Sequence, residues 1–123
     1  MTDDIKKKID VVFIAGGKFH DIDFARLEIL KLLAEDDRMK VRVFEDYSNL
    51  HAIEKADFLI TYTCDVRPTL EQQRVLKDYV SSGNRWLALH GTNSILQFMS
   101  DGKVDSPRIA PVMMETLGSQ FIA

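Results

Sequence analysis

The ten residues 84–93, NRWLALHGTN, decide the fold expected of this 123-residue chain. An apolar run, Trp86–Leu89, stands between two groups of turn-forming residues, Ser81–Asn84 and Gly91–Asn93. A short apolar run of this kind is typical of a strand that is buried on both faces, as in a parallel sheet. The stretch therefore predicts a buried strand followed directly by a sharp turn.

The predicted strand ends at His90, and Gly91 follows it directly. We expect a short helix to begin at Asn93 or Ser94 and to end near Met99. A strand that turns sharply into a helix at a titratable residue resembles a nucleophile elbow, with His90 in place of the usual serine or cysteine. Two interpretations are open: a binding or catalytic site without that nucleophile, or a structural turn that contains a histidine.

Three further strands are predicted upstream of this stretch. Ile9–Ala15 is β-branched and almost entirely apolar, as expected for a central strand of a parallel sheet. Lys40–Phe44 alternates polar and apolar residues, which favours a more exposed strand near an edge. Asp57–Thr63 is again mostly apolar and leads into Cys64. With the strand at Trp86–Leu89, the chain supplies four strands.

Helical patterns separate these strands. Asp21 or Asp23 is expected to cap a helix that ends near Glu35 and has an apolar face containing Phe24, Leu27, Ile29, Leu30 and Leu33. Thr69 and Gln72 form a capping-box pattern at the start of the next helix, and Gly83 is placed to end it. Residues 46–53 are expected to form a loop with a short helical turn, and residues 112–117 one or two helical turns. The tail 119–123 is apolar enough to begin a strand.

Strands that alternate with helices predict right-handed crossovers and a mostly parallel sheet with helices on both faces. We therefore expect one doubly wound α/β domain over residues 1–123, with a flavodoxin-like strand order of 2-1-3-4. Sheets of this kind bind ligands beyond the carboxyl ends of their strands.

Four chemically reactive side chains follow the carboxyl ends of three predicted strands. His20 follows the first, Cys64 and Asp65 follow the third, and His90 ends the fourth. Because these strands are neighbours in the expected order, the four side chains should converge on one rim. Each also has a structural interpretation. His90 could be a turn histidine, and His20 a solvated loop histidine. Cys64 could be a small buried thiol, and Asp65 a carboxylate that caps the turn.

Loop residues beside these side chains complete the predicted site. Gly16 and Gly17 allow backbone conformations that are closed to other residues, so their loop can turn tightly or admit a ligand to the main chain. Gly91, Thr92 and Asn93 follow His90 directly. The candidate ligand-contacting residues are therefore Gly16, Gly17, Cys64, Asp65, Gly91, Thr92 and Asn93.

Composition narrows the function classes. A formal net charge of −3 gives no electrostatic reason to expect nucleic acid, and the basic run Lys6–Lys8 is offset by Asp3, Asp4 and Asp10 as in a solvated terminus. No apolar stretch approaches the ~20 residues needed to cross a bilayer. The start lacks a signal peptide's apolar segment, and a single cysteine forms no internal disulfide, so we expect a cytoplasmic protein.

Several short motifs, in order along the chain, resemble the ThuA-like (trehalose-utilisation) family of the class I glutamine amidotransferase-like superfamily. They are Gly16-Gly17-x-x-His20, Leu70-Glu71-Gln72-Gln73, Tyr79-Val80-x-x-Gly83, Leu87-Ala88-Leu89-His90 and Leu117-Gly118-Ser119-Gln120-Phe121. The last resembles the family's Leu-Gly-Gly-x-Phe segment, with Ser119 at the second glycine. In the family that segment runs on into a His-Pro pair and further strands, so we expect the amino-terminal portion of a longer domain.

This resemblance implies a flavodoxin-like sheet and a role in the metabolism of trehalose, related glycosides or keto-sugars. His90 stands where the amidotransferases have their cysteine, which argues against glutamine amidotransferase activity. Two imidazoles on one rim could act as general acid and base on a sugar, as in a hydrolase or isomerase. Equally, His20 and His90 could bind a divalent metal with Asp65 or a further residue.

Two other functions stay open at this point. The chain could be a degenerate or truncated domain that binds a sugar or a partner without catalysis, because it lacks a complete triad. A thiol hydrolase that uses Cys64 and His90 is the third hypothesis. A sheet that ended early would leave an open edge and an uncovered face, which favours a homodimer.

Overall fold

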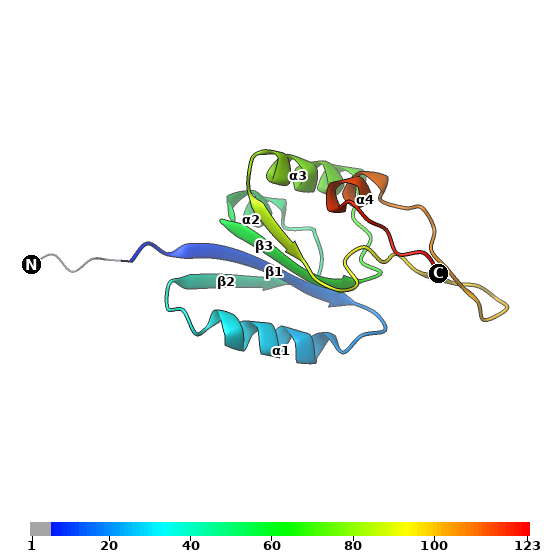
Figure 1. The fold of residues 1–123 in the computed structure, drawn as a ribbon, viewed down its shortest axis with the longest axis horizontal. Coiled ribbons are helices and arrows are strands. Elements are labelled where there is room, and N and C mark those ends of the chain that lie inside the picture. The colour runs from blue at the N-terminus through cyan, green and yellow to red at the C-terminus, as the bar shows by residue number, and fades with distance from the viewer. Residues whose placement is uncertain (1–5) are drawn as a thin grey trace, which may run out of the picture.

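Four parallel strands form the sheet of the computed structural model, which describes residues 6–123 (Figure 1). The strands lie in the order β2-β1-β3-β4 and are β1 (Ile9–Gly17), β2 (Met39–Phe44), β3 (Phe58–Cys64) and β4 (Arg85–Ala88). The helices are α1 (Ile22–Leu33), α2 (Leu50–Lys55), α3 (Leu70–Ser81) and α4 (Pro111–Leu117). A separate antiparallel hairpin pairs β5 (Gln97–Phe98) with β6 (Val104–Asp105). The predicted α/β class and the 2-1-3-4 order are confirmed.

Helices cover both faces of the sheet, as predicted (Figure 1). On one face, α1 packs its Leu33 with Val11, Phe13 and Ile60 of the central strands. On the other face, a larger core combines the sheet with buried side chains of α2, α3 and α4. β1 lies between β2 and β3 and is buried from Val11 to Gly16, which explains its nearly continuous apolar sequence.

Local capping fixes the starts of two helices where the sequence predicted them. The Asp21 carboxylate accepts a 3.0 Å hydrogen bond from the Phe24 amide at the start of α1. At the start of α3, the Thr69 hydroxyl accepts from the Gln72 amide, and the Gln72 side chain accepts from the Thr69 amide. These reciprocal bonds satisfy amides that a helix start leaves without partners. The capping box is confirmed.

The predicted apolar face of α1 is wrong in part. Ile29, Leu30 and Leu33 face the sheet, whereas Phe24 is 62% exposed and Leu27 is also exposed. At 100° per residue, Phe24 falls on the opposite side of the helix from Leu33, so one helix cannot bury both against one sheet.

β4 is an edge strand rather than a strand buried on both faces. It pairs only with β3 among the described residues, and Leu87 is 55% exposed. In the parallel register, Leu87 stands beside Ile60 on the face that α1 covers, and α1 does not extend over β4. An apolar run alone therefore did not distinguish a central strand from an edge strand.

The expected homodimer and the expected truncation both stay predictions.

Residues 93–99 do not form the predicted helix. A turn at residues 90–93 leads instead to the hairpin, in which Phe98 pairs with Val104. The Thr92 hydroxyl donates to the Leu89 carbonyl at 2.8 Å, and this bond stabilises the turn. The tail 119–123 does not form a strand either, although the Phe121 amide donates to the Asn93 carbonyl.

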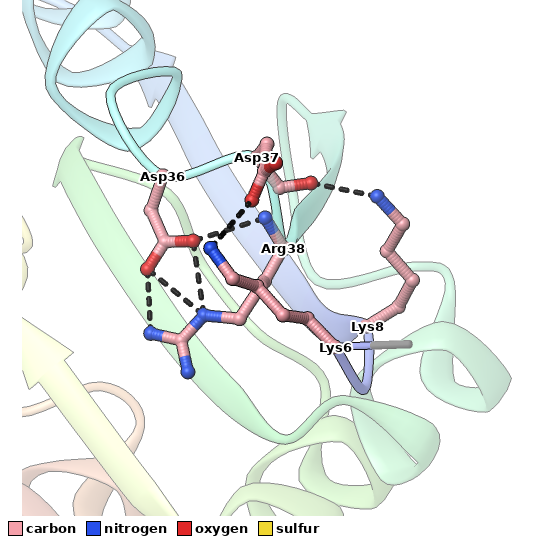
Figure 2. A network of polar contacts seen from close by, with 5 residues as sticks. All are labelled: Lys6, Lys8, Asp36, Asp37 and Arg38. Carbon is pink, nitrogen blue, oxygen red and sulfur yellow. Dashed lines mark hydrogen bonds and ion pairs between the residues drawn. The ribbon is translucent and has the colours of Figure 1, made fainter. Parts of the chain in front are cut away.

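Ion pairs gather at the amino-terminal end of the sheet, where β1 begins and α1 turns into β2 (Figure 2). Arg38 forms a forked pair with Asp36, with distances of 2.6–3.1 Å. Lys6 lies 3.8 Å from the Asp37 carboxylate, and Lys8 donates to the Asp37 carbonyl at 2.6 Å. The basic run thus contacts the α1–β2 turn, a partner that the sequence did not suggest. Asp3 and Asp4, which the sequence suggested as its counter-charges, lie outside the described residues.

Within residues 6–123, no helix combines the length and the apolar character that a membrane crossing requires.

Candidate functional site

Two histidines far apart in the sequence meet at the carboxyl ends of β1, β3 and β4. The His20 and His90 rings have centroids 5.0 Å apart and planes inclined at 57°. Tyr62 of β3 meets the His20 ring edge-on, with centroids 6.1 Å apart. The predicted convergence of His20 and His90 therefore occurs in the structure, and Tyr62 joins them.

The β1–α1 loop carries His20 to this position. The Lys18 amide donates to the Cys64 carbonyl at 3.0 Å, which ties the loop to the end of β3. The next residue, Phe19, has a φ of 67°, in the left-handed region that side chains other than glycine rarely adopt. His20 Nδ1 then lies 3.3 Å from the Lys18 carbonyl oxygen. The loop is thus held at both sides of the strained residue.

Three predicted ligand-contacting glycines have a structural role. A Cβ on Gly91, at φ 90°, would stand 2.2 Å from the Thr63 carbonyl oxygen, and one on Gly17, at φ 108°, would stand 1.9 Å from the Cys64 carbonyl oxygen. Both positions exclude any side chain because the end of β1 and the turn after His90 pass directly against the end of β3. A Cβ on Gly16 would likewise meet the Glu45 carbonyl. The glycines allow this close approach of the backbone and thereby bring His20 and His90 together.

Asp65 joins three loops beneath the histidines. Its carboxylate, whose side chain is 4% exposed, accepts from Arg67 Nε at 3.0 Å, from the Leu96 amide at 3.1 Å and from Lys18 Nζ at 3.3 Å. Burial by itself raises the pKa of this carboxyl, but the hydrogen bonds from Arg67, Leu96 and Lys18 outweigh burial and hold the pKa below its usual range. Asp65 is therefore a charged anchor of the rim.

Cys64 does not contact the rim surface. Its side chain is buried against the loop at Gly91. Burial and the neighbouring Asp65 carboxylate raise the pKa of the thiol. Because the thiolate is the nucleophilic form, these surroundings argue against a catalytic thiol, and the interpretation as a small buried residue is supported.

The turn after His90 lines a hollow of about 290 Å³ on the side of the rim that faces α4. Thr92 is buried, with its hydroxyl 2.8 Å from the Thr61 hydroxyl, while Asn93 donates to the Ser119 hydroxyl at 3.0 Å. The hollow is lined by Ala88, Leu89, His90, Gly91, Thr92, Asn93, Leu117 and Ser119. Of the predicted contact residues after His90, Asn93 is thus beside a space that can admit a small molecule, and Thr92 fixes the turn.

Sequence reasoning missed four side chains of this rim: Lys18, Phe19, Tyr62 and Arg67. Tyr62 carried a usable signal, because it lies two residues before Cys64 near the carboxyl end of β3, and alternation along a strand places these two residues on the same face. Arg67 follows Asp65 by two residues, whereas Lys18 is distant from it in the sequence. The pairing of Lys18 with Asp65 depends on the loop conformations and had no sequence signal.

Residues 6–123 contain no group of three or more histidine, cysteine, aspartate or glutamate side chains that could hold a metal ion. Asp65, the expected third ligand, is engaged by Lys18, Arg67 and the Leu96 amide. His20 and His90 alone are near enough to share a ligand, so the metal site stays a two-residue hypothesis.

No family model, curated protein or solved structure matches the chain. The ThuA-like assignment therefore stays a prediction that depends on the short motifs between Gly16 and Phe121.

Proposed function

We propose that this protein is a ThuA-like domain that binds a small sugar at the rim formed by His20, His90 and Tyr62. The observation that carries the proposal is the approach of the two imidazole rings to 5.0 Å at the carboxyl ends of parallel strands. Ligands of open α/β sheets bind at this end of the sheet. The hollow beside His90 supplies space for a small polar molecule.

The chemistry of the rim suits a polyhydroxylated ligand. Imidazole nitrogens donate and accept hydrogen bonds, and the Tyr62 and Asn93 side chains add a hydroxyl and an amide. Two imidazoles with centroids 5.0 Å apart could also act as general acid and general base on one bound sugar, as a sugar isomerase or a glycoside hydrolase requires. A trehalose-like glycoside or a keto-sugar is the ligand that this chemistry and the family resemblance together favour.

A specific observation favours a second candidate, in which the rim binds a sugar without catalysis. Acid–base catalysis by histidine commonly uses a carboxylate that orients the imidazole. In this rim the nearest predicted carboxylate, Asp65, bonds to Lys18, Arg67 and Leu96 instead. Binding and turnover therefore have to be measured separately.

The three histidines of the chain allow a matched experiment. His20→Ala and His90→Ala remove the paired rings, while His51→Ala removes an exposed histidine of α2. Each variant is titrated with trehalose, glucose and fructose, and ligand-induced NMR shifts give the affinities. We expect His20→Ala or His90→Ala to weaken binding about ten-fold, as for one lost hydrogen bond, and His51→Ala to leave it unchanged.

The same samples test catalysis. If the wild-type protein converts trehalose or fructose and the His90→Ala variant does not, the result favours an enzyme. If the wild-type protein binds a sugar without converting it, the result favours the second candidate. If the wild-type protein bound none of the sugars, or if all three histidine variants behaved alike, the proposed function would be wrong.

A further inference from the structure

Two phenylalanines stand side by side on the surface next to the histidine pair. Phe19 of the β1–α1 loop and Phe98 of β5 have ring centroids 4.8 Å apart and planes inclined at 58°. Phe19 is 57% exposed and Phe98 is 56% exposed, although each is partly covered by the other. Adjacent exposed apolar side chains of this size mark an interaction site more often than isolated ones do.

The backbone holds this aromatic pair in place at a conformational cost. Phe19 adopts its ring position with a φ of 67°, and strain at a non-glycine residue persists only where the surroundings impose it. The surroundings are the hydrogen bond from the Lys18 amide to the Cys64 carbonyl and the helix cap at Asp21. The strained backbone thus presents an apolar ring to solvent.

The aromatic pair and the histidine pair belong to one surface. Phe19 and His20 are consecutive residues, with Cα atoms ~3.8 Å apart, and they contact Phe98 and His90 respectively. Asp65 joins the two segments that carry the phenylalanines, because it accepts from Lys18 beside Phe19 and from the amide of Leu96, two residues before Phe98. A ligand that is bound at the histidines and is longer than one ring can therefore contact the phenylalanines as well.

We propose that Phe19 and Phe98 form a subsite for a second ring, so that the rim selects glycosides of at least two rings over monosaccharides. This inference rests on the proposed sugar-binding function. One sugar ring bonds to His20 and His90, and the next ring lays its apolar C–H face on the phenylalanines. The hydroxyls of a pyranose point outward around the ring, which leaves such a face for contact with an aromatic ring.

Three substitutions at exposed phenylalanines separate this role from a structural one. Phe98→Leu keeps an apolar side chain in the hairpin but removes the aromatic face, while Phe98→Tyr keeps the ring. Phe24→Leu makes the same exchange at a comparably exposed phenylalanine in the first turn of α1. Trehalose serves as the two-ring probe and glucose as the one-ring probe, with affinities from ligand-induced NMR shifts.

We expect Phe98→Leu to weaken trehalose binding about five-fold, the effect typical of one lost aromatic contact, and to leave glucose binding unchanged. Phe98→Tyr and Phe24→Leu should bind both sugars as the wild-type protein does. Equal weakening for trehalose and glucose would mean that Phe98 only supports the loop, and no weakening would mean that no ring binds there; either result overturns the subsite and leaves the proposed function intact. If the wild-type protein binds neither sugar, both proposals fail together.

Discussion

The two ends of the parallel sheet use their charged side chains differently. At the amino-terminal end, Arg38 pairs with Asp36 two residues away, and Lys6 and Lys8 bond to Asp37 in the same turn (Figure 2). At the carboxyl end, the Asp65 carboxylate bonds to Arg67, also two residues away, and in addition to Lys18 and the Leu96 amide, which belong to two other loops.

Burial accounts for the difference. Solvent screens the amino-terminal pairs, and exposed ion pairs contribute little to stability. The Asp65 carboxylate is 4% exposed, so its bonds to Lys18, Arg67 and Leu96 replace water that it has lost. A charged cluster therefore positions a site only where it is buried and connects segments distant in sequence.

The largest expected effect tests the backbone contacts of the carboxyl end. Gly91→Ala and Gly83→Ala are a matched pair, because both glycines have a φ near +90°. A Cβ at Gly91 would also meet the Thr63 carbonyl oxygen, whereas one at Gly83 would meet nothing within 4 Å. We expect Gly91→Ala to lower the free energy of unfolding by about 3 to 5 kcal/mol and Gly83→Ala by about 1 to 2 kcal/mol, measured by urea denaturation. Equal losses would show that φ alone matters at both sites.

A smaller difference in stability is expected between variants of two carboxylates, Asp65 and Asp36. Asp65→Asn keeps a side chain that tolerates the observed φ of 56° but removes the charge that Lys18 and Arg67 share. We expect a loss of about 1 to 3 kcal/mol in the free energy of unfolding. Asp36→Asn at the exposed end should be indistinguishable from the wild-type protein in the same urea titration. A comparable loss in both variants would remove the distinction between the two ends.

The smallest effect is a pH dependence. The Asp65 pKa lies below its usual range in the folded protein, so its ionised form contributes stability above the unfolded-state pKa of about 3.9, and this is lost as the pH falls through the lower folded-state pKa. Urea midpoints between pH ~6 and ~3 should therefore fall less steeply for Asp65→Asn than for the wild-type protein.

Asp36 is the control for this titration. Hydrogen bonds from Arg38 lower the pKa of its carboxyl too, but the Asp36 side chain is 34% exposed, so solvent screens this pair and reduces its contribution to stability. Asp36→Asn should therefore leave the acid profile close to that of the wild-type protein. An Asp36→Asn profile as flat as that of Asp65→Asn would contradict the role of burial in separating the two carboxylates.

Local patterns in the sequence determined much of the fold. Alternation along residues 40–44 predicted an exposed edge strand, the caps at Asp21 and Thr69 predicted two helix starts, and the order of elements predicted the sheet. These signals are local because a cap or a period depends on residues within one or two turns. The meeting of His20 with His90 was predictable too, because parallel neighbours place their carboxyl ends together.

Only the tertiary structure decided the exposure of Leu87, the hairpin at Phe98 and the partners of Asp65. An apolar run has the same sequence at a central or an edge position, and the extent of α1 over the sheet leaves Leu87 exposed. Gln97 and Phe98 pair with Val104–Asp105 in the hairpin instead of continuing the predicted helix, and this pairing needs residues outside that segment. Asp65 became an anchor because Gly17 and Gly91 let two loops pass against the end of β3. Sequence periodicity determines which elements form, whereas close contacts between distant backbone segments determine which side chains share a surface.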